Sequence, residues 1–264
     1  CQYPAPARDR LVATCVRAGY LQVYAMPLTG LVPADWSDAR IEAEIEASRD
    51  PWEQLFLLQR RVSRARERAP RAELYRRLVM GHLALREYDS AEAYLAPLAP
   101  LAEAGSALGG WVAVQRETAG HRREEQRLRH GNLTEDFVDA QRARLGRLDA
   151  HFASAHGSVR RLARLAEAEI YLVLGDREAA HAMFDAIEVS DERDVSVLQA
   201  WAALAEGLLR EENDRGGWGA VHRRLSLHPA LSERDRLYHA RAFVEALRAG
   251  RSAEQELPRL ARAP

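Results

Sequence analysis

His121 and the two acidic residues shortly after it are the side chains whose types and spacing come closest to a metal-binding pattern. Glu124 and Glu125 follow His121 by three and four positions, so a helix would place an imidazole and a carboxylate on one face. Both groups bind zinc, but a zinc site needs at least three protein ligands. The sequence has no HExxH motif, and no third ligand can be named from spacing. We therefore predict solvated histidines and expect no metal site and no cofactor.

Other motifs for catalysis are absent from the sequence. All 38 basic residues are arginine, which excludes a P-loop lysine, a Schiff-base lysine and a pyridoxal phosphate linkage. There is no GxSxG elbow, and two cysteines without a CxxC motif provide neither a four-cysteine zinc site nor a redox pair. The glycine-rich stretch 105–110 has no preceding strand and is neither GxGxxG nor a P-loop, so we interpret it as a joint. We therefore expect that this protein is not an enzyme and that it has no small-molecule substrate.

Arginines concentrate most strongly between residues 60 and 77. Such a surface can bind RNA or lipid head groups, but Glu67 and Glu73 interrupt it, and its only aromatic residue, Tyr75, is needed for packing. The formal net charge of −1 gives no general attraction to nucleic acid. We interpret the cluster as a charged helix exterior and expect no nucleic-acid partner. Its members are Arg60, Arg61, Arg64, Arg66, Arg68, Arg71, Arg76 and Arg77.

Two short helices joined by a tight turn are predicted for residues 164–187, and the rest of the chain is organised around them. Gly175 can end the first helix because it tolerates a left-handed conformation, and Asp176 can cap the second. Ala168 and Ala180 are small enough to let neighbouring helices approach closely. The segment is a helical hairpin and not a catalytic motif.

This hairpin resembles the tetratricopeptide repeat, whose 34-residue pattern contains W-x2-L-G-x2-Y followed by A-x3-F. Ala168 begins an A-x2-Y match and Ala180 an A-x3-F match, while Trp201 begins a second first-helix copy and Tyr75 a weaker third one. Arg164 stands where the aromatic residue belongs, and the copies are unevenly spaced. We predict an all-α fold of irregular antiparallel helical hairpins stacked as a tetratricopeptide-like superhelix. The alternative is an unrelated helical bundle.

The resemblance implies a protein partner. In tetratricopeptide-like proteins the first helices of successive hairpins line a concave groove that holds a peptide or a helix of another protein. The alternative is that these positions pack against neighbouring helices. By repeat position, the groove would be lined by Glu73, Arg76 and Met80, by Leu165, Glu169 and Leu172, and by Ala202, Glu206 and Arg210.

The chain divides into four predicted segments: an N-terminal tether and lead-in (1–34), N-terminal helical hairpins (35–104), the glycine-rich joint and a C-terminal helical-repeat region (111–264). Within the lead-in, Tyr20 to Tyr24 fits either a short strand or the end of a helix.

Capping signals predict several helix starts. Asp50 precedes Pro51, which suits the first position of a helix, Asn132 is expected to cap another helix, and Ser232 begins a helix that stops at Gly250. A turn is predicted for residues 216–219.

The chain begins with Cys1 and not with methionine, and in this it resembles a mature bacterial lipoprotein, whose signal peptide is cut just before a lipid-bearing cysteine. The proline-containing residues 2–7 would be a tether, and Gln2 in place of aspartate favours the outer membrane of a Gram-negative host. The alternative is a sequence boundary that happens to fall at a cysteine. No stretch is long and apolar enough to span a bilayer.

Together these patterns predict a non-catalytic, lipid-anchored helical-repeat scaffold that faces the periplasm and binds another cell-envelope protein. One alternative is a soluble cytoplasmic adaptor or sensor module of the same fold. The other is a peptidoglycan-acting helical enzyme with a catalytic glutamate, for which no segment suggests a catalytic domain.

Overall fold

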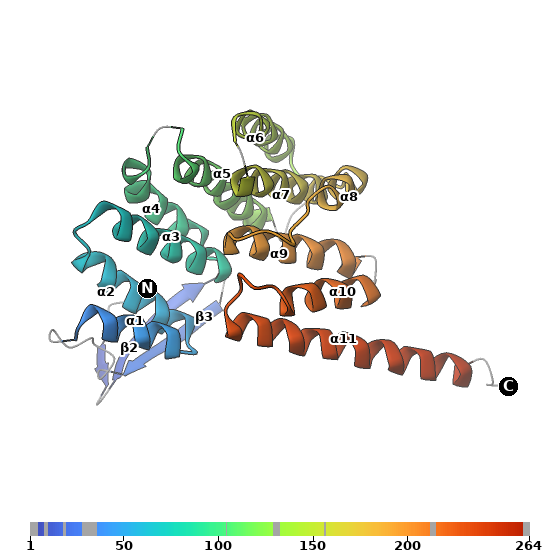
Figure 1. The fold of residues 1–264 in the computed structure, drawn as a ribbon, viewed down its shortest axis with the longest axis horizontal. Helices are drawn as coiled ribbons and strands as arrows, with labels where there is room; N and C mark the ends of the chain where they lie inside the picture. The colour runs from blue at the N-terminus through green and yellow to red at the C-terminus, as the bar shows by residue number, and fades with distance from the viewer. Residues whose placement is uncertain are drawn as a thin grey trace. The chain divides into compact units, whose positions relative to one another are not determined.

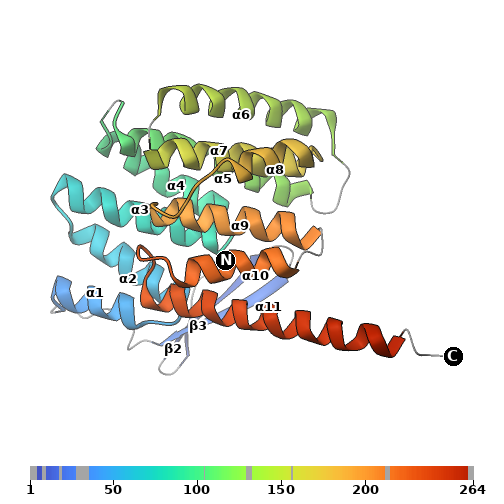
Figure 2. The same cartoon turned by 45° about the vertical axis from the view of Figure 1, so that its right-hand side comes forward.

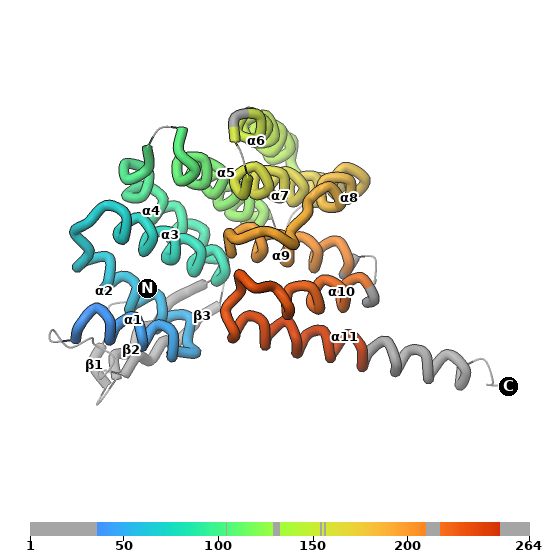
Figure 3. Tube along the Cα trace, viewed as in Figure 1, coloured from blue at the N-terminus to red at the C-terminus, as the bar shows by residue number. Residues whose placement is uncertain are grey.

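The structure is a computed structural model in which the chain forms two compact units, residues 1–101 and 102–264. Figure 3 traces the chain from end to end. Side chains are described between residues 36 and 248, with gaps. The backbone is described for residues 5–7, 10–17, 20–27, 36–103, 105–128, 133–155, 157–211 and 215–260.

The first unit begins with a small antiparallel sheet in the order β1-β2-β3, drawn as arrows in Figure 1. Its strands are β1 (Ala5–Ala7), β2 (Arg10–Arg17) and β3 (Tyr20–Pro27). Valine, threonine and tyrosine, which favour strands, are frequent in β2 and β3. Of the two structures predicted for Tyr20 to Tyr24, the strand is confirmed, since these residues lie in β3. The segment predicted as a tether and lead-in therefore contains a sheet.

Every described element after this sheet is helical, which confirms the predicted helical class for the chain from Asp38 onward. In the first unit, each helix packs against the next one along the chain. As predicted, Asp50 caps the second helix by accepting a hydrogen bond from the backbone of Trp52 (2.9 Å), and Pro51 is its first residue. The helices are α1 (Asp38–Ala47), α2 (Pro51–Arg64), α3 (Arg68–Ala84) and α4 (Tyr88–Leu98), followed by a 3-10 turn at Ala99–Leu101.

The second unit is built around α7 (Gly157–Val173), which contacts four other helices of the unit. Both views show α7 between α6 and α9, with α10 and α11 following α9 in order (Figure 1 and Figure 2). None of the described helices combines the length and apolarity needed to cross a membrane. The other helices are α5 (Ala107–Leu128), α6 (Glu135–Ser154), α8 (Arg177–Asp185), α9 (Val195–Glu211), α10 (Arg215–Ser226) and α11 (Glu233–Leu260).

The predicted hairpin over residues 164–187 is confirmed as α7, a tight turn and α8. Gly175 ends the first helix with a φ of 85°, in the left-handed region that glycine tolerates. Asp176 caps α8 by accepting a hydrogen bond from the backbone of Ala179 (3.1 Å). Ala168 and Ala180 are completely buried, as close helix packing requires.

Two glycine-rich stretches are helical where the sequence predicted a joint and a turn. Ser106 caps α5 by accepting a hydrogen bond from the backbone of Gly109 (3.1 Å), so the last four residues of the joint form the first turn of α5. A Cβ on Gly110 would lie 2.9 Å from Cγ1 of Val159, which shows how closely α5 approaches α7. Residues 216–219 lie within α10. At Gly110, glycine permits close packing and does not provide a hinge.

Two further predicted boundaries are corrected. Asn132 lies outside the described residues, and the cap of α6 is Thr134, which accepts a hydrogen bond from the backbone of Phe137 (3.3 Å). Ser232 caps α11 as predicted, but that helix continues past Gly250 to Leu260. A single glycine lowers helix stability by only about 1 kcal/mol, which neighbouring strong helix formers can offset.

Candidate functional site

A cavity of about 640 Å³ lies in the second unit, where α6, α7, α8 and the loop after α8 meet. The hairpin of α7 and α8 forms most of its wall. The lining residues are Phe152, Arg160, Arg161, Arg164, Ala179, Ala182, Met183, Ala186, Ile187 and Glu188.

Three arginines of α7 give the cavity its positive charge. Arg160 and Arg164 lie over the ring of Phe152, with guanidinium carbons 4.2 and 3.5 Å from the ring centroid. This cation–π stacking orients two flexible side chains against α6. Arg160 is exposed, and among the described residues no carboxylate pairs with it. Arg160 is therefore available to an external anion.

The guanidinium of Arg164 pairs with an internal carboxylate. It donates a hydrogen bond to Oε2 of Glu167 (2.5 Å), one helical turn along α7, and it lies 3.9 Å from a carboxylate oxygen of Asp149. Glu167 is only 2% exposed, and burial raises its pKa although Arg164 opposes that shift. Arg164 thus compensates the charge of the buried Glu167, and the same guanidinium, stacked on Phe152, also lines the cavity.

The loop after α8 is organised by Glu192, whose side chain is almost fully buried. Its carboxylate accepts hydrogen bonds from the Ser158 hydroxyl (2.6 Å) and the Arg161 guanidinium (2.9 Å). The backbone N–H groups of Arg193 and Asp194 donate to it as well, at 2.8 Å each. Burial alone would raise the pKa of Glu192, but these hydrogen bonds outweigh burial and lower it. The network fixes Arg161 at the edge of the cavity.

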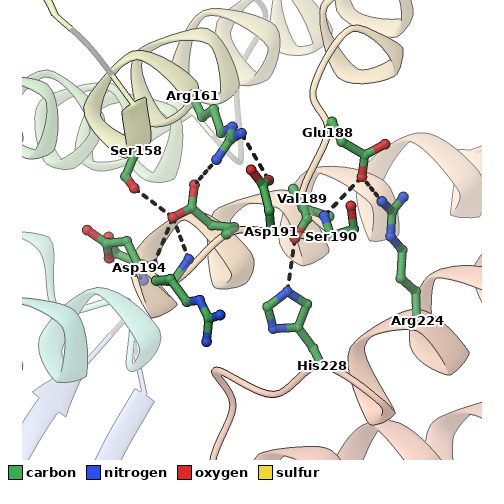
Figure 4. A network of polar contacts seen from close by, with 12 residues as sticks. Ser158, Arg161, Glu188, Val189, Ser190, Asp191, Asp194, Arg224 and His228 are labelled. Atoms are coloured by element: carbon green, nitrogen blue, oxygen red, sulfur yellow. Dashed lines mark hydrogen bonds and ion pairs between the residues drawn. The ribbon is translucent and has the colours of Figure 1, made fainter.

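The same loop is attached to α10 and to the turn that follows it. His228 donates a hydrogen bond from Nε2 to the carbonyl of Val189 (2.9 Å), because its Nδ1 accepts from the backbone of Ala230 (3.3 Å). Glu188, the acidic residue of the cavity lining, forms an ion pair with Arg224 of α10 (Figure 4). His228 and Arg224 therefore both hold the loop, and the ion pair with Arg224 neutralises the negative charge of Glu188.

Part of the cavity lining is apolar. Met183 and Ile187 provide the larger side chains, and three alanines of α8 and its C-terminal end complete it. Guanidinium groups and apolar side chains in one lining suit a ligand that carries carboxylates next to apolar side chains. The described lining residues include no serine, cysteine or histidine. This arrangement supports binding and offers no nucleophile with an adjacent base.

The predicted groove residues occupy varied positions. In the first unit, Glu73 is exposed and pairs with Arg76 (3.4 Å), while Met80 is half-buried. In the last set, Ala202 and Glu206 are half-buried, and the side chain of Arg210 lies outside the described residues.

The central set follows the packing alternative. Leu165 lies in the core at 2% exposure, and Leu172 packs on α9, 3.2 Å from where a Cβ on Gly207 would lie. Glu169 forms a two-pronged ion pair with Arg122 of α5, with N···O distances of 2.7 and 2.9 Å. These three positions lie against neighbouring helices because α7 packs against both α5 and α9.

The predicted basic cluster meets carboxylates of α1. Arg61 and Arg64 pair with Asp38, and Arg77 pairs with Glu42. These contacts lie within the first unit and offset part of the positive charge of the cluster. They agree with the interpretation as a charged helix exterior.

His121 is not solvated, contrary to the prediction, because it lies at 1% exposure between helices of the second unit. Glu125 and Glu169 each place a carboxylate oxygen near its ring. Glu124, the other ligand considered from sequence, binds Arg144 instead (2.6 Å). Of the described residues, His121, Glu125 and Glu169 are the group with the types and proximity to hold a metal ion.

The arginine-lined cavity was not predicted from the sequence. The only local signal is the spacing of Arg160, Arg161 and Arg164, which places them on neighbouring positions of one helix. Phe152 lies on another helix and Glu192 in a distant loop, so only the folded chain assembles the site.

No family model matches this sequence, and no curated protein matches it.

Proposed function

We propose that this protein is a non-catalytic helical-repeat scaffold that binds an acidic segment of a partner protein in the cavity beside α7 and α8. The observation that carries the proposal is a cavity lined by three arginines together with apolar side chains. Guanidinium groups bind carboxylates through paired hydrogen bonds, and the apolar part of the lining would accept an apolar side chain of the same segment.

The charges of the lining support an acidic ligand. Arg160, Arg161 and Arg164 contribute three positive charges, against the single negative charge of Glu188. That acid is already paired with Arg224 and so does not repel a ligand strongly. Arg160 is exposed and its stacking on Phe152 leaves its N–H edge able to donate, so we assign it the main contact with a ligand carboxylate.

A tetratricopeptide-like arrangement of the second unit is part of this proposal. Helix α9 packs against both members of the α7–α8 pair, as the first helix of a following repeat would. Phe184, from the A-x3-F match, stacks on Trp201 of α9 with ring centroids 5.3 Å apart. These contacts support a repeat interface between successive hairpins.

Attachment to the outer membrane through Cys1 remains a prediction, since Cys1 lies outside the described residues. The intact mass of the protein from its native membranes tests it. A mass increase that matches a diacylglyceryl group on Cys1 would favour the envelope scaffold. An unmodified Cys1, or a Cys1 preceded by further residues, would favour the cytoplasmic adaptor.

Peptide binding tests the cavity directly. A short fluorescent peptide that alternates glutamate with leucine is titrated with wild-type protein, and a peptide with lysine in place of glutamate is the comparison. We expect Arg160→Gln to weaken binding of the acidic peptide by at least about tenfold, because one charge-assisted hydrogen bond contributes about 1.5–3 kcal/mol. Arg142→Gln is the matched control, since Arg142 is an exposed arginine of α6 outside the cavity.

Equal binding of the two peptides, or equal loss in the two variants, would contradict the proposed site. The enzyme alternative has a separate test, which is release of glycan fragments from peptidoglycan. Activity abolished by a single glutamate substitution would replace the scaffold proposal.

A further inference from the structure

A buried histidine and two glutamates come together between α5 and α7, away from the cavity. A ring nitrogen of His121 and one carboxylate oxygen each from Glu125 and Glu169 all lie within 4.8 Å of one another. His121 and Glu125 are four positions apart on α5, so they share one face of that helix. Glu169 reaches the same point from α7.

The ring of His121 is held in the orientation that a metal ligand requires. Its Nδ1 lies 2.8 Å from Oε1 of Gln141, an oxygen that can only accept, so Nδ1 carries the proton. The amide nitrogen of Gln141 donates to Glu124 (2.8 Å), which fixes this assignment of the amide. Nε2 is then left with a lone pair. A histidine that donates through one nitrogen to an oxygen and offers the other is typical of metal sites.

Nε2 of His121 is fully buried and has no hydrogen-bond partner among the described residues. A buried acceptor without a partner costs about 1–3 kcal/mol, so such atoms are rare in folded proteins. Glu125 is half-buried, and it forms no ion pair or hydrogen bond with another described residue. A cation between these groups would satisfy both.

The charge of the cluster favours a cation. The two carboxylates carry two negative charges, and Arg122 offsets one of them through its ion pair with Glu169. Each oxygen of Glu169 accepts one hydrogen bond from Arg122 and keeps a second lone pair. The ion pair therefore orients Glu169 without using its full capacity as a ligand.

We propose that His121, Glu125 and Glu169 form a site for a divalent transition-metal ion, zinc in the first place, that links α5 to α7. One imidazole nitrogen and two carboxylates suit zinc, whereas magnesium prefers oxygen ligands alone. Water would complete the coordination.

The ligands need a small adjustment to reach bonding distance. Tetrahedral zinc with bonds of about 2.0–2.1 Å places its ligand atoms about 3.3 Å apart. Atoms now up to 4.8 Å apart must therefore approach by up to about 1.5 Å. Rotation of the two glutamate side chains supplies this movement, and Glu125 is the freer of the two.

Calorimetric titration of the chelator-treated full chain with zinc chloride tests the site, with magnesium chloride as the comparison. We expect one equivalent of zinc to bind and magnesium not to compete. Glu125→Gln should weaken zinc binding by at least tenfold, since losing even an indirect partner of a metal ligand costs about 10–100-fold. Circular dichroism confirms that each variant is folded.

Two controls separate this site from others. Glu103→Gln removes an exposed acid of the same unit, and His239→Asn removes one member of the contact between His222 and His239, another place where zinc could bind. Both should bind zinc like wild type. A shift of the His121 Nε2 resonance on zinc addition would show direct coordination. Absence of zinc binding, wild-type affinity in Glu125→Gln, or loss only in His239→Asn would overturn the proposal.

Discussion

Glu192 and Asp191 offer a matched test of how the loop after α8 is held. Both carboxylates contact the guanidinium of Arg161, at 2.9 Å and 3.1 Å. The side chain of Glu192 is 1% exposed, and that of Asp191 is 73% exposed. Replacing each with alanine removes the same kind of contact from two different environments.

The expected cost of Glu192→Ala follows from the groups that it leaves behind. The half-buried hydrogen bonds from the backbone N–H groups of Arg193 and Asp194 lose their shared acceptor, and each N–H group that finds no new partner costs about 1–3 kcal/mol. Ser158 and Arg161 are only half-buried and can turn to water, so they add less. We expect a loss of about 3 kcal/mol in the free energy of unfolding, within a range of about 2–5 kcal/mol. Asp191→Ala should cost about 0–1 kcal/mol, as exposed ion pairs do.

Urea unfolding followed by circular dichroism measures both variants at pH 7 and in acid. The folded-state pKa of Glu192 is lowered, so its contribution to stability is present above pH 4.5 and is lost as the pH falls through the folded value. The difference between wild type and Glu192→Ala should therefore shrink below pH 4.5. At pH 7, Glu192→Ala should lose clearly more free energy of unfolding than Asp191→Ala, because only Glu192 is buried. A difference of less than about 1 kcal/mol between the two variants would refute this expectation.

Three further changes test other contacts. Burial and the neighbouring His222 lower the pKa of His239 to about 4, although Asp235 acts in the opposite direction. Between pH 6.5 and 4 the unfolded chain therefore binds more protons than the folded chain does. Unfolding free energy should fall by up to about 3 kcal/mol as the pH drops through this window, and His239→Asn should flatten that slope in urea titrations. Gly110→Val should overpack the contact between α5 and α7 and lower the free energy of unfolding by about 1–3 kcal/mol, which a lower melting temperature would show. A higher melting temperature would contradict the close approach of the two helices. Asp176→Ala should cost about 1 kcal/mol in unfolding free energy, while Asp176→Asn keeps the cap and costs less.

Glu192 also connects stability to the proposed binding function. Its buried carboxylate holds the half-exposed guanidinium of Arg161 at the cavity. Loss of Glu192 would release that arginine to its remaining partner, Asp191, on the exposed side of the loop. Weaker binding of an acidic peptide by Glu192→Ala would therefore accompany its lower stability.

Local sequence determined the helices and many of their ends. Asp50 with Pro51, Gly175 with Asp176, and Ser232 each act within one turn of the chain, so their capping roles follow from residue type alone. Gly110 was predicted to lie in a joint and instead lies in α5, because nothing nearby in sequence reveals that Val159 of α7 packs against it.

The candidate sites depended on tertiary structure because their parts come from separate helices. Sequence spacing paired His121 with a nearby glutamate, but the third candidate ligand, Glu169, is contributed by α7. Likewise, Arg160 faces Phe152 only because α6 packs beside α7. Helical periodicity determines which residues share one face of a helix, whereas packing between helices determines which faces meet.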